Sequence, residues 1–167
     1  MTDLELWRRG WCLATALLVP LMVLLSPRWL QLDATGPAWS VLWLLPWALV
    51  DGPWSGALVG AGLALLLDAL HPGAVSQVPA LVLLGWWWGR LGRRSVVMER
   101  SLSLGLLALA GSLVLGVSVL AQLALTGAWP ASALQVLWAQ TLLTALLAPL
   151  VCSLWLLIWR QQLPGVR

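Results

Sequence analysis

The chain has 167 residues, of which 61% are hydrophobic and only 9% are charged. Because a soluble domain carries about 25% charged residues, this composition cannot cover a water-soluble globule of this size. It excludes an ordinary soluble enzyme or binding domain and indicates that lipid surrounds most of the chain.

The apolar residues form segments that Pro, Gly and charged residues separate. We expect an all-α polytopic membrane helix bundle, and we treat 1–167 as a single integral membrane domain because little sequence is left over for another module. About six transmembrane helices are expected, with four or five as alternatives. The expected spans cover approximately residues 11–25, 39–50, 54–70, 75–89, 102–125 and 134–159.

The first segment follows Arg8 and Arg9, a pattern that a secretory signal peptide also shows. The sequence after the segment, Ser26-Pro27-Arg28, does not resemble the small-residue cleavage site of such a peptide. We therefore interpret the segment as a retained first span.

The second and third segments are separated by Asp51-Gly52-Pro53. One helix through both would be roughly 50 Å long at about 1.5 Å per residue, against a hydrocarbon core of about 30 Å. Pro53 also lacks the helical N–H donor and its ring clashes with the preceding turn. The sequence therefore predicts a tight helical hairpin.

Small residues recur at every fourth position in the third, fourth and fifth segments. This spacing lets helix backbones approach each other closely inside a membrane. Packing within the bundle is the favoured interpretation, and contact with a second copy or a partner protein is the alternative. The residues are Gly56 and Gly60, Gly85 and Gly89, and Ala108, Ser112 and Gly116.

Asp68 lies near the outer end of the third segment, just before the turn His71-Pro72-Gly73. A carboxylate at membrane depth is costly and marks either a function or a hydrogen-bond network. Structural anchoring, in which Asp68 caps the neighbouring turn, is the favoured interpretation. A proton, ion or ligand role and a partner contact are the alternatives.

The remaining polar residues are poor candidates for chemistry. Cys12 and Cys152 lie in apolar runs and His71 is the single histidine, so we expect no metal site, no cofactor and no catalytic triad. The chain is therefore not expected to be an enzyme. Four glutamines are expected to form hydrogen bonds between helices, namely Gln77, Gln122, Gln135 and Gln140.

The arginines predict the orientation. With six spans and the N-terminus inside, eight of the nine arginines fall in inner segments and only Arg28 falls outside. This asymmetry is typical of cytoplasmic loops, so both termini are expected to be cytoplasmic and the chain to lie in a bacterial inner membrane. The net charge of +3 then reflects topology rather than nucleic-acid binding. The basic segment 90–100 also suits anionic headgroups or a cytoplasmic partner.

Tryptophans are expected at both membrane interfaces, where the indole ring meets lipid and its N–H meets water. At the outer interface we place Trp29, Trp39 and Trp129. The inner group comprises Trp7, Trp11, Trp47, Trp54, Trp86 to Trp88, Trp155 and Trp159.

A motif runs from Gly56 as Gly-Ala-Leu-Val-Gly-Ala-Gly-Leu-Ala-Leu-Leu-Leu to Asp68, followed by a Pro/Gly turn and a segment that ends Gly85-Trp-Trp-Trp-Gly89-Arg90. It resembles the MreD family of bacterial rod shape-determining proteins, in which a Gly-containing helix closed by Leu-Leu-Asp precedes a helix ending in Gly-x-x-x-Gly-Arg. The resemblance covers about a quarter of the chain. It departs at Ser76, where the family often has Gly, and at the following proline.

The resemblance implies a non-enzymatic membrane scaffold that takes part in the control of cell shape and peptidoglycan synthesis. Its implied partners are MreC and, through it, the MreB filament and peptidoglycan synthases, besides membrane lipid; a homo-oligomer is also compatible. The family is similar in fold to the substrate-binding subunits of energy-coupling-factor vitamin transporters, which makes such a subunit the alternative. That alternative requires a cavity lined with polar groups, and the outer halves of the predicted spans contain few.

Overall fold

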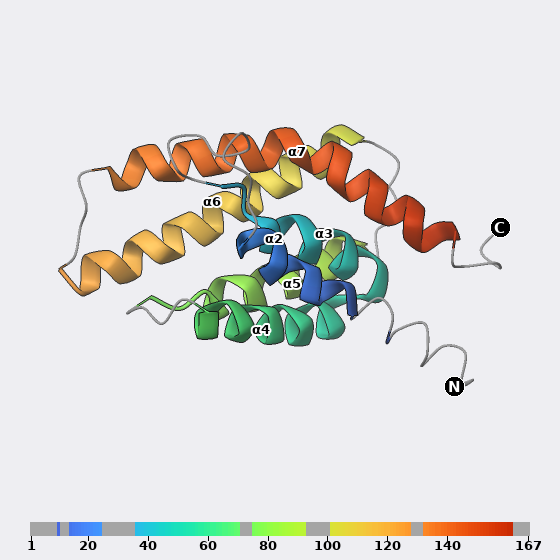
Figure 1. The fold of residues 1–167 in the computed structure, drawn as a ribbon, viewed down its shortest axis with the longest axis horizontal. Helices are drawn as coiled ribbons and strands as arrows, with labels where there is room; N and C mark the ends of the chain where they lie inside the picture. Colours follow the sequence, from blue (N-terminus) through green and yellow to red (C-terminus); the bar gives the residue numbers. More distant parts are fainter. Residues whose placement is uncertain are drawn as a thin grey trace.

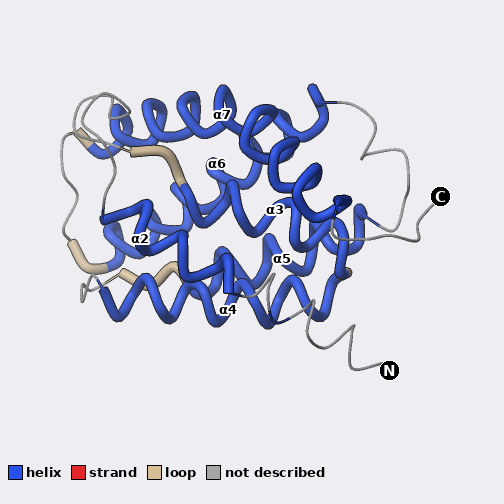
Figure 2. Tube along the Cα trace, turned by 45° about the vertical axis from the view of Figure 1, so that its right-hand side comes forward, coloured by secondary structure: helices blue, strands red, loops and turns tan. Residues whose placement is uncertain are grey.

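The computed structural model describes residues 10, 14–24, 36–70, 75–92, 101–127 and 132–161. Within these ranges the regular structure is entirely helical, which confirms the predicted all-α class for this part of the chain (Figure 2). A 3-10 turn, η1 (Thr15–Leu17), precedes six α-helices: α2 (Leu18–Leu24), α3 (Trp39–Asp51), α4 (Pro53–Leu70), α5 (Val78–Gly92), α6 (Ser101–Leu125) and α7 (Ala133–Gln161).

The predicted hairpin between the second and third segments is confirmed. Helix α3 ends at Asp51 and α4 begins at Pro53, so a single residue, Gly52, makes the turn. Gly52 has φ of 100°, a conformation that side chains with a Cβ rarely adopt. Pro53 occupies the first helical position, where its fixed φ suits the helix and its missing N–H needs no partner.

Helix α3 forms the centre of the molecule. Every residue from Ser40 to Leu49 is buried, and α4, α5 and α7 pack around it (Figure 1). Its 13 residues give a length of about 20 Å, shorter than the hydrocarbon core of about 30 Å. A helix that is apolar on all sides has to be covered by other helices, and its position explains how so short a segment is accommodated.

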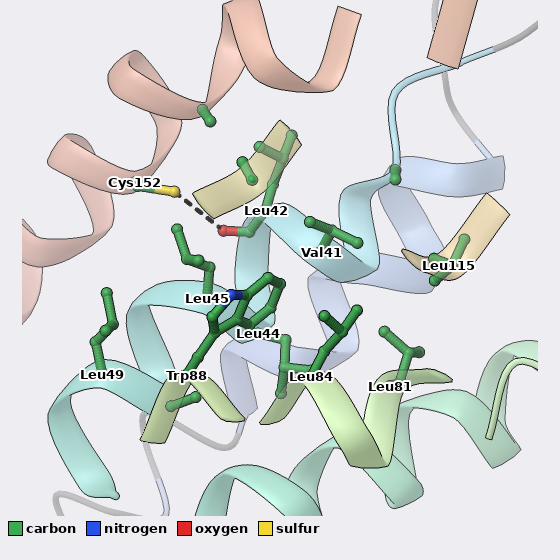
Figure 3. Close-up of a cluster of buried hydrophobic side chains, with 14 of the residues drawn as sticks. Val41, Leu42, Leu44, Leu45, Leu49, Leu81, Leu84, Trp88, Leu115 and Cys152 are labelled. Carbon is green, nitrogen blue, oxygen red and sulfur yellow. Dashed lines mark hydrogen bonds between the residues drawn. The ribbon is translucent and has the colours of Figure 1, made fainter. Parts of the chain in front are cut away.

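The core lies between α3 and α5. Figure 3 shows Trp88 of α5 among leucines of α3, with Cys152 of α7 close by. The Sγ of Cys152 lies 3.6 Å from the carbonyl oxygen of Leu42. In a second cluster, the rings of Trp43 and Trp47 stack at a centroid distance of 5.6 Å. These contacts join α3 to α5 and α7 and leave the far sides of the longer helices uncovered.

Among the described residues, three helices are long and apolar enough to cross a membrane, namely α4, α6 over Ser103–Leu125 and α7 over Ala133–Ile158. In the most apolar stretch of each, only 33%, 28% and 22% of the residues are buried. Large apolar side chains such as Leu106 and Leu146 are therefore exposed. In a helix of a soluble protein, most side chains of this kind are buried. The chain is a multi-pass membrane protein.

Successive helices run in opposite directions along the long axis of the molecule (Figure 1). Helices α2, α4 and α6 run one way, and α3, α5 and α7 return. The second part of α7 changes direction (Figure 1), and this helix contains Pro149, which removes a backbone hydrogen bond and bends the helix. Because the six helices alternate in direction, the start of α2 and the end of α7 lie at the same end of the bundle.

The helix bounds follow the predicted spans with two differences. Helix α5 begins at Val78 rather than residue 75 and continues to Gly92, because Ser76 and Gln77 cap its first turn. In the first span the structure describes η1 and α2, and the rest of the predicted segment lies outside the described residues.

The predicted tryptophan belt is partly wrong. Trp88 has no exposed surface and Trp47 is 5% exposed, because both rings fill the core rather than facing lipid. Trp54, by contrast, is 75% exposed, and Trp86 and Trp87 are 40% and 37% exposed. Sequence position near a helix end identified these residues, but only packing decides which way each ring points.

Candidate functional site: a glycine-packed helical hairpin

Helices α4 and α5 form an antiparallel hairpin whose two backbones touch. A Cβ on Gly60 would lie 2.6 Å from the carbonyl oxygen of Leu81, and a Cβ on Gly56 would meet the carbonyl oxygen of Gly85. Side-chain carbons do not approach backbone oxygens this closely. Only glycine therefore permits this helix separation, in the manner of small-residue packing in membranes.

The contact continues to the end of the hairpin. A Cβ on Gly89 would collide with the backbone of Gly52 and Pro53, and one on Gly92 would lie 2.7 Å from the Cα of Leu49. Gly92 was not among the predicted site residues, although it follows Gly85 by seven positions and so continues the same helix face. The glycine face thus seats α5 against α4 and against the end of α3.

The structure brings four of the five predicted site residues into this one interface: Gly56, Gly60, Gly85 and Gly89, all of which are buried. They pack against the backbone of the neighbouring helix within the bundle. In the fifth segment, a Cβ on Gly116 would come within 2.9 Å of Leu137 of α7, so this residue also serves packing within the bundle.

Asp68, the fifth predicted site residue, closes the hairpin at the opposite end from Gly89. Its carboxylate accepts the hydroxyl of Ser76 at 2.7 Å and the backbone N–H of Gln77 at 3.1 Å. The Oγ of Ser76 in turn accepts the backbone N–H of Val78 at 3.2 Å. These N–H groups begin α5 and have no partner within that helix, and the partial positive charge of a helix N-terminus favours a carboxylate there.

Gln122 of α6 joins this network. Its Oε1 accepts the backbone N–H of Ser76 at 2.8 Å, and its Nε2 donates to the carbonyl oxygen of the same residue at 2.8 Å. The same Nε2 lies 3.4 Å from the Oγ of Ser118. Of the four glutamines predicted to connect helices, Gln122 does so among the described residues. The segment before α5 is thereby held by both α4 and α6.

Sequence reasoning did not identify Ser76 as the centre of the network. The signal was present, since Ser favours positions just before a helix, where its hydroxyl accepts a backbone N–H. The resemblance instead drew attention to Ser76 as a departure from glycine. In this chain the serine has a structural role, because glycine would have no hydroxyl to donate to Asp68.

Arg90 lies in the last turn of α5, at the glycine-packed end of the hairpin. Its guanidinium carbon lies 4.8 Å from the centroid of the Trp86 ring, within range of a cation–π interaction. Trp86, Trp87 and Arg90 are all exposed. This end of α5 therefore presents an oriented cation to the surroundings.

The described residues offer no metal centre, because no three of His, Cys, Asp and Glu gather within them. Cys152 is buried and free, whereas Cys12 and His71 lie outside the described residues. The cluster of polar groups that most resembles a reactive site is the Asp68 network, and its groups form hydrogen bonds to one another. In that network the Ser76 hydroxyl lies beside the Asp68 carboxylate, and both groups bind backbone N–H groups at the start of α5.

An apolar groove of about 590 Å³ lies between α2, α3 and α7. Its one hydroxyl, on Ser153, donates to the carbonyl oxygen of Leu150 at 2.9 Å and so stays within its own helix. The lining residues are Leu18, Val19, Met22, Trp39, Leu42, Trp43, Leu150, Val151, Ser153, Leu154, Trp155 and Leu157.

Neither a family model, nor a curated protein, nor a solved structure matches the chain. What the structure shows is a multi-pass membrane protein built of helices, with three long apolar candidate spans. Its most distinctive feature is the α4–α5 hairpin, packed through glycine at one end and closed by Asp68 at the other.

Proposed function

We propose that this protein is a non-enzymatic inner-membrane scaffold of the cell-elongation machinery, of the MreD kind. In this role it binds the membrane-anchored protein MreC and thereby connects to MreB and the peptidoglycan synthases. Its activity is to hold partners in place, which requires a rigid bundle and no catalytic group.

The observation that supports the proposal best is that the residues carrying the MreD resemblance form one structural unit. Gly56 and Gly60 pack against the backbone of α5, and Asp68 caps the first turn of the same helix. Residues spread over 34 positions of an apolar chain, from Gly56 to Gly89, thus contribute to one structural feature. That feature is a stiff helical hairpin within the membrane.

The proposed orientation has six crossings with both termini in the cytoplasm. The alternation of helix directions (Figure 1) and the eight arginines of the inner segments both support it. The exposed Trp54 and Arg90 belong to the cytoplasmic end in this orientation, and Asp68 to the periplasmic end.

The alternative, a vitamin-binding transporter subunit, receives less support. A small-molecule site has a few placed polar groups that fix the orientation of its ligand. The groove between α2, α3 and α7 has almost none, since the hydroxyl of Ser153 bonds to its own helix. Binding of a vitamin by the purified protein at nanomolar concentration would nevertheless favour this alternative over the scaffold.

Depletion of the protein in its rod-shaped host tests the proposal. Cells are expected to become round, and MreC is expected to co-purify with the tagged protein from detergent extracts. Two variants sharpen the test. When expressed in the depleted cells, Gly62→Ala should restore the rod shape, because a Cβ at this position meets nothing within 4 Å. Gly85→Leu should not restore it. Unchanged morphology on depletion, together with no recovery of MreC, would defeat the proposal.

A further inference from the structure

The outward face of α5 changes character along its length. Leu83, Trp86, Trp87 and Arg90 follow one another at i, i+3, i+4 and i+7, which places them on one side of the helix. All four are exposed, with Leu83 at 55%. From the middle of the helix to its end, the face therefore passes from aliphatic to aromatic to cationic.

This order matches the layers of a phospholipid monolayer. Seven residues of α-helix rise about 10 Å, and each headgroup layer is roughly 5–8 Å thick. With Leu83 in hydrocarbon, the two indole rings lie at the interface, the depth that Trp prefers. Arg90 then lies at the level of the lipid phosphates.

The guanidinium of Arg90 is oriented but has no anion of its own. It rests on the ring of Trp86 at 4.8 Å, and among the described residues it forms no ion pair. A guanidinium has five donors in a planar fork that fits a phosphate. Stacking on the indole fixes one face of that plane and leaves its donors available.

The charge of the sequence that begins at Arg90 favours an anionic lipid over a zwitterionic one. The segment 90–100 contains four arginines, namely Arg90, Arg93, Arg94 and Arg100, against a single acid, Glu99. One further carboxylate, Asp51, ends α3 at the same end of the hairpin, next to the turn against which Gly89 packs. The balance is strongly positive, and a cytoplasmic leaflet carries negative surface potential.

We infer that the end of α5 is a binding site for the headgroup of an anionic phospholipid, such as phosphatidylglycerol. Arg90 holds the phosphate, Trp86 orients the guanidinium, and Trp87 packs beside the glycerol and upper acyl carbons. The inference rests on the proposed orientation, which places this end of α5 at the cytoplasmic leaflet, but not on the proposed scaffold role.

The test is native mass spectrometry of the full-length protein released from bilayer nanodiscs made of equal parts phosphatidylcholine and phosphatidylglycerol. The wild-type protein should retain phosphatidylglycerol in preference to phosphatidylcholine. Arg90→Gln should lower that preference about fivefold, since a basic residue near an anionic surface contributes on the order of 1 kcal/mol. Trp86→Leu keeps the charge but frees the guanidinium and should lower it about two- to fivefold.

Arg28→Gln is the matched control, because it removes the same charge far from this segment in the sequence. It should leave the lipid preference unchanged, and circular dichroism of each variant verifies that the helices remain. Arg90→Lys, which keeps the charge and the fold, should retain only part of the preference. Equal retention of the two lipids by the wild type, or an equal loss in Arg90→Gln and Arg28→Gln, would overturn the inference and leave an acidic protein segment as the partner of Arg90.

Discussion

The carbonyl oxygen of Gly85 lies too close to Gly56 to leave room for a Cβ there, and the carbonyl oxygen of Gly56 blocks a Cβ on Gly85 in the same way. The relationship is reciprocal, so neither residue can gain a single carbon unless the helices separate. In lipid, where no hydrophobic drive brings helices together, such close contact is a main source of their association.

Gly85→Ala should therefore destabilise the bundle by about 1–3 kcal/mol, the usual cost of forcing extra carbon into a packed interior. A lowered midpoint of thermal unfolding in detergent would show it. Gly62→Ala is the matched control on α4, since its Cβ meets nothing within 4 Å. The control should be neutral or slightly stabilising, because Ala favours helix over Gly. Equal midpoints for Gly85→Ala and the wild type would contradict the packing.

Asp68→Ala should cost about 1–3 kcal/mol, because it leaves the N–H of Gln77 and the hydroxyl of Ser76 without their acceptor. Gln122→Ala removes the other two bonds to Ser76 and should cost a similar amount. Because both side chains hold the same short segment, the double variant should lose less than the sum of the two. Strict additivity of the unfolding free energies would show that the network does not act as a unit.

Two buried threonines of α7 provide a direct comparison. The Oγ1 of Thr144 accepts the backbone N–H of Ala38 at 3.0 Å and so tethers the start of α3. The hydroxyl of Thr141 donates only to Leu137 of its own helix. Thr144→Val should therefore cost about 1–3 kcal/mol, the penalty for an unpaired buried donor, and Thr141→Val clearly less. A reversed order of the two unfolding midpoints would argue against the tether.

Much of the fold could be predicted from sequence because lipid imposes simple rules. Apolar runs bounded by Pro and Gly gave the helices, and Asp51-Gly52-Pro53 marked a turn that no helix can continue through. Glycines at every fourth position indicated helix contacts. The carboxylate of Asp68 was expected to cap the adjacent turn. Each of these features depends on residues close together in the chain.

Features that depend on distant residues were not predictable in the same way. Trp88 stands next to Trp86 and Trp87 in sequence, yet it is buried while they are exposed, because α3 and Gly111 of α6 cover its side of α5. The bonds from Gln122 to Ser76 span 46 residues. Which helix lies at the centre likewise depended on packing, and the shortest of the six predicted segments, 39–50, took that place.

The proposed topology requires all six helices to cross the membrane, so that both termini share the cytoplasmic side. Reporter fusions truncated after Gly52, Gly73 and Arg100, and one at Arg167, test this directly with a cytosol-active and a periplasm-active enzyme. The account predicts that the fusions at Gly52, Arg100 and Arg167 are cytoplasmic and that the fusion at Gly73 is periplasmic. If only α4, α6 and α7 crossed, the fusions at Gly52 and Arg167 would lie on opposite sides, and that result would contradict the account.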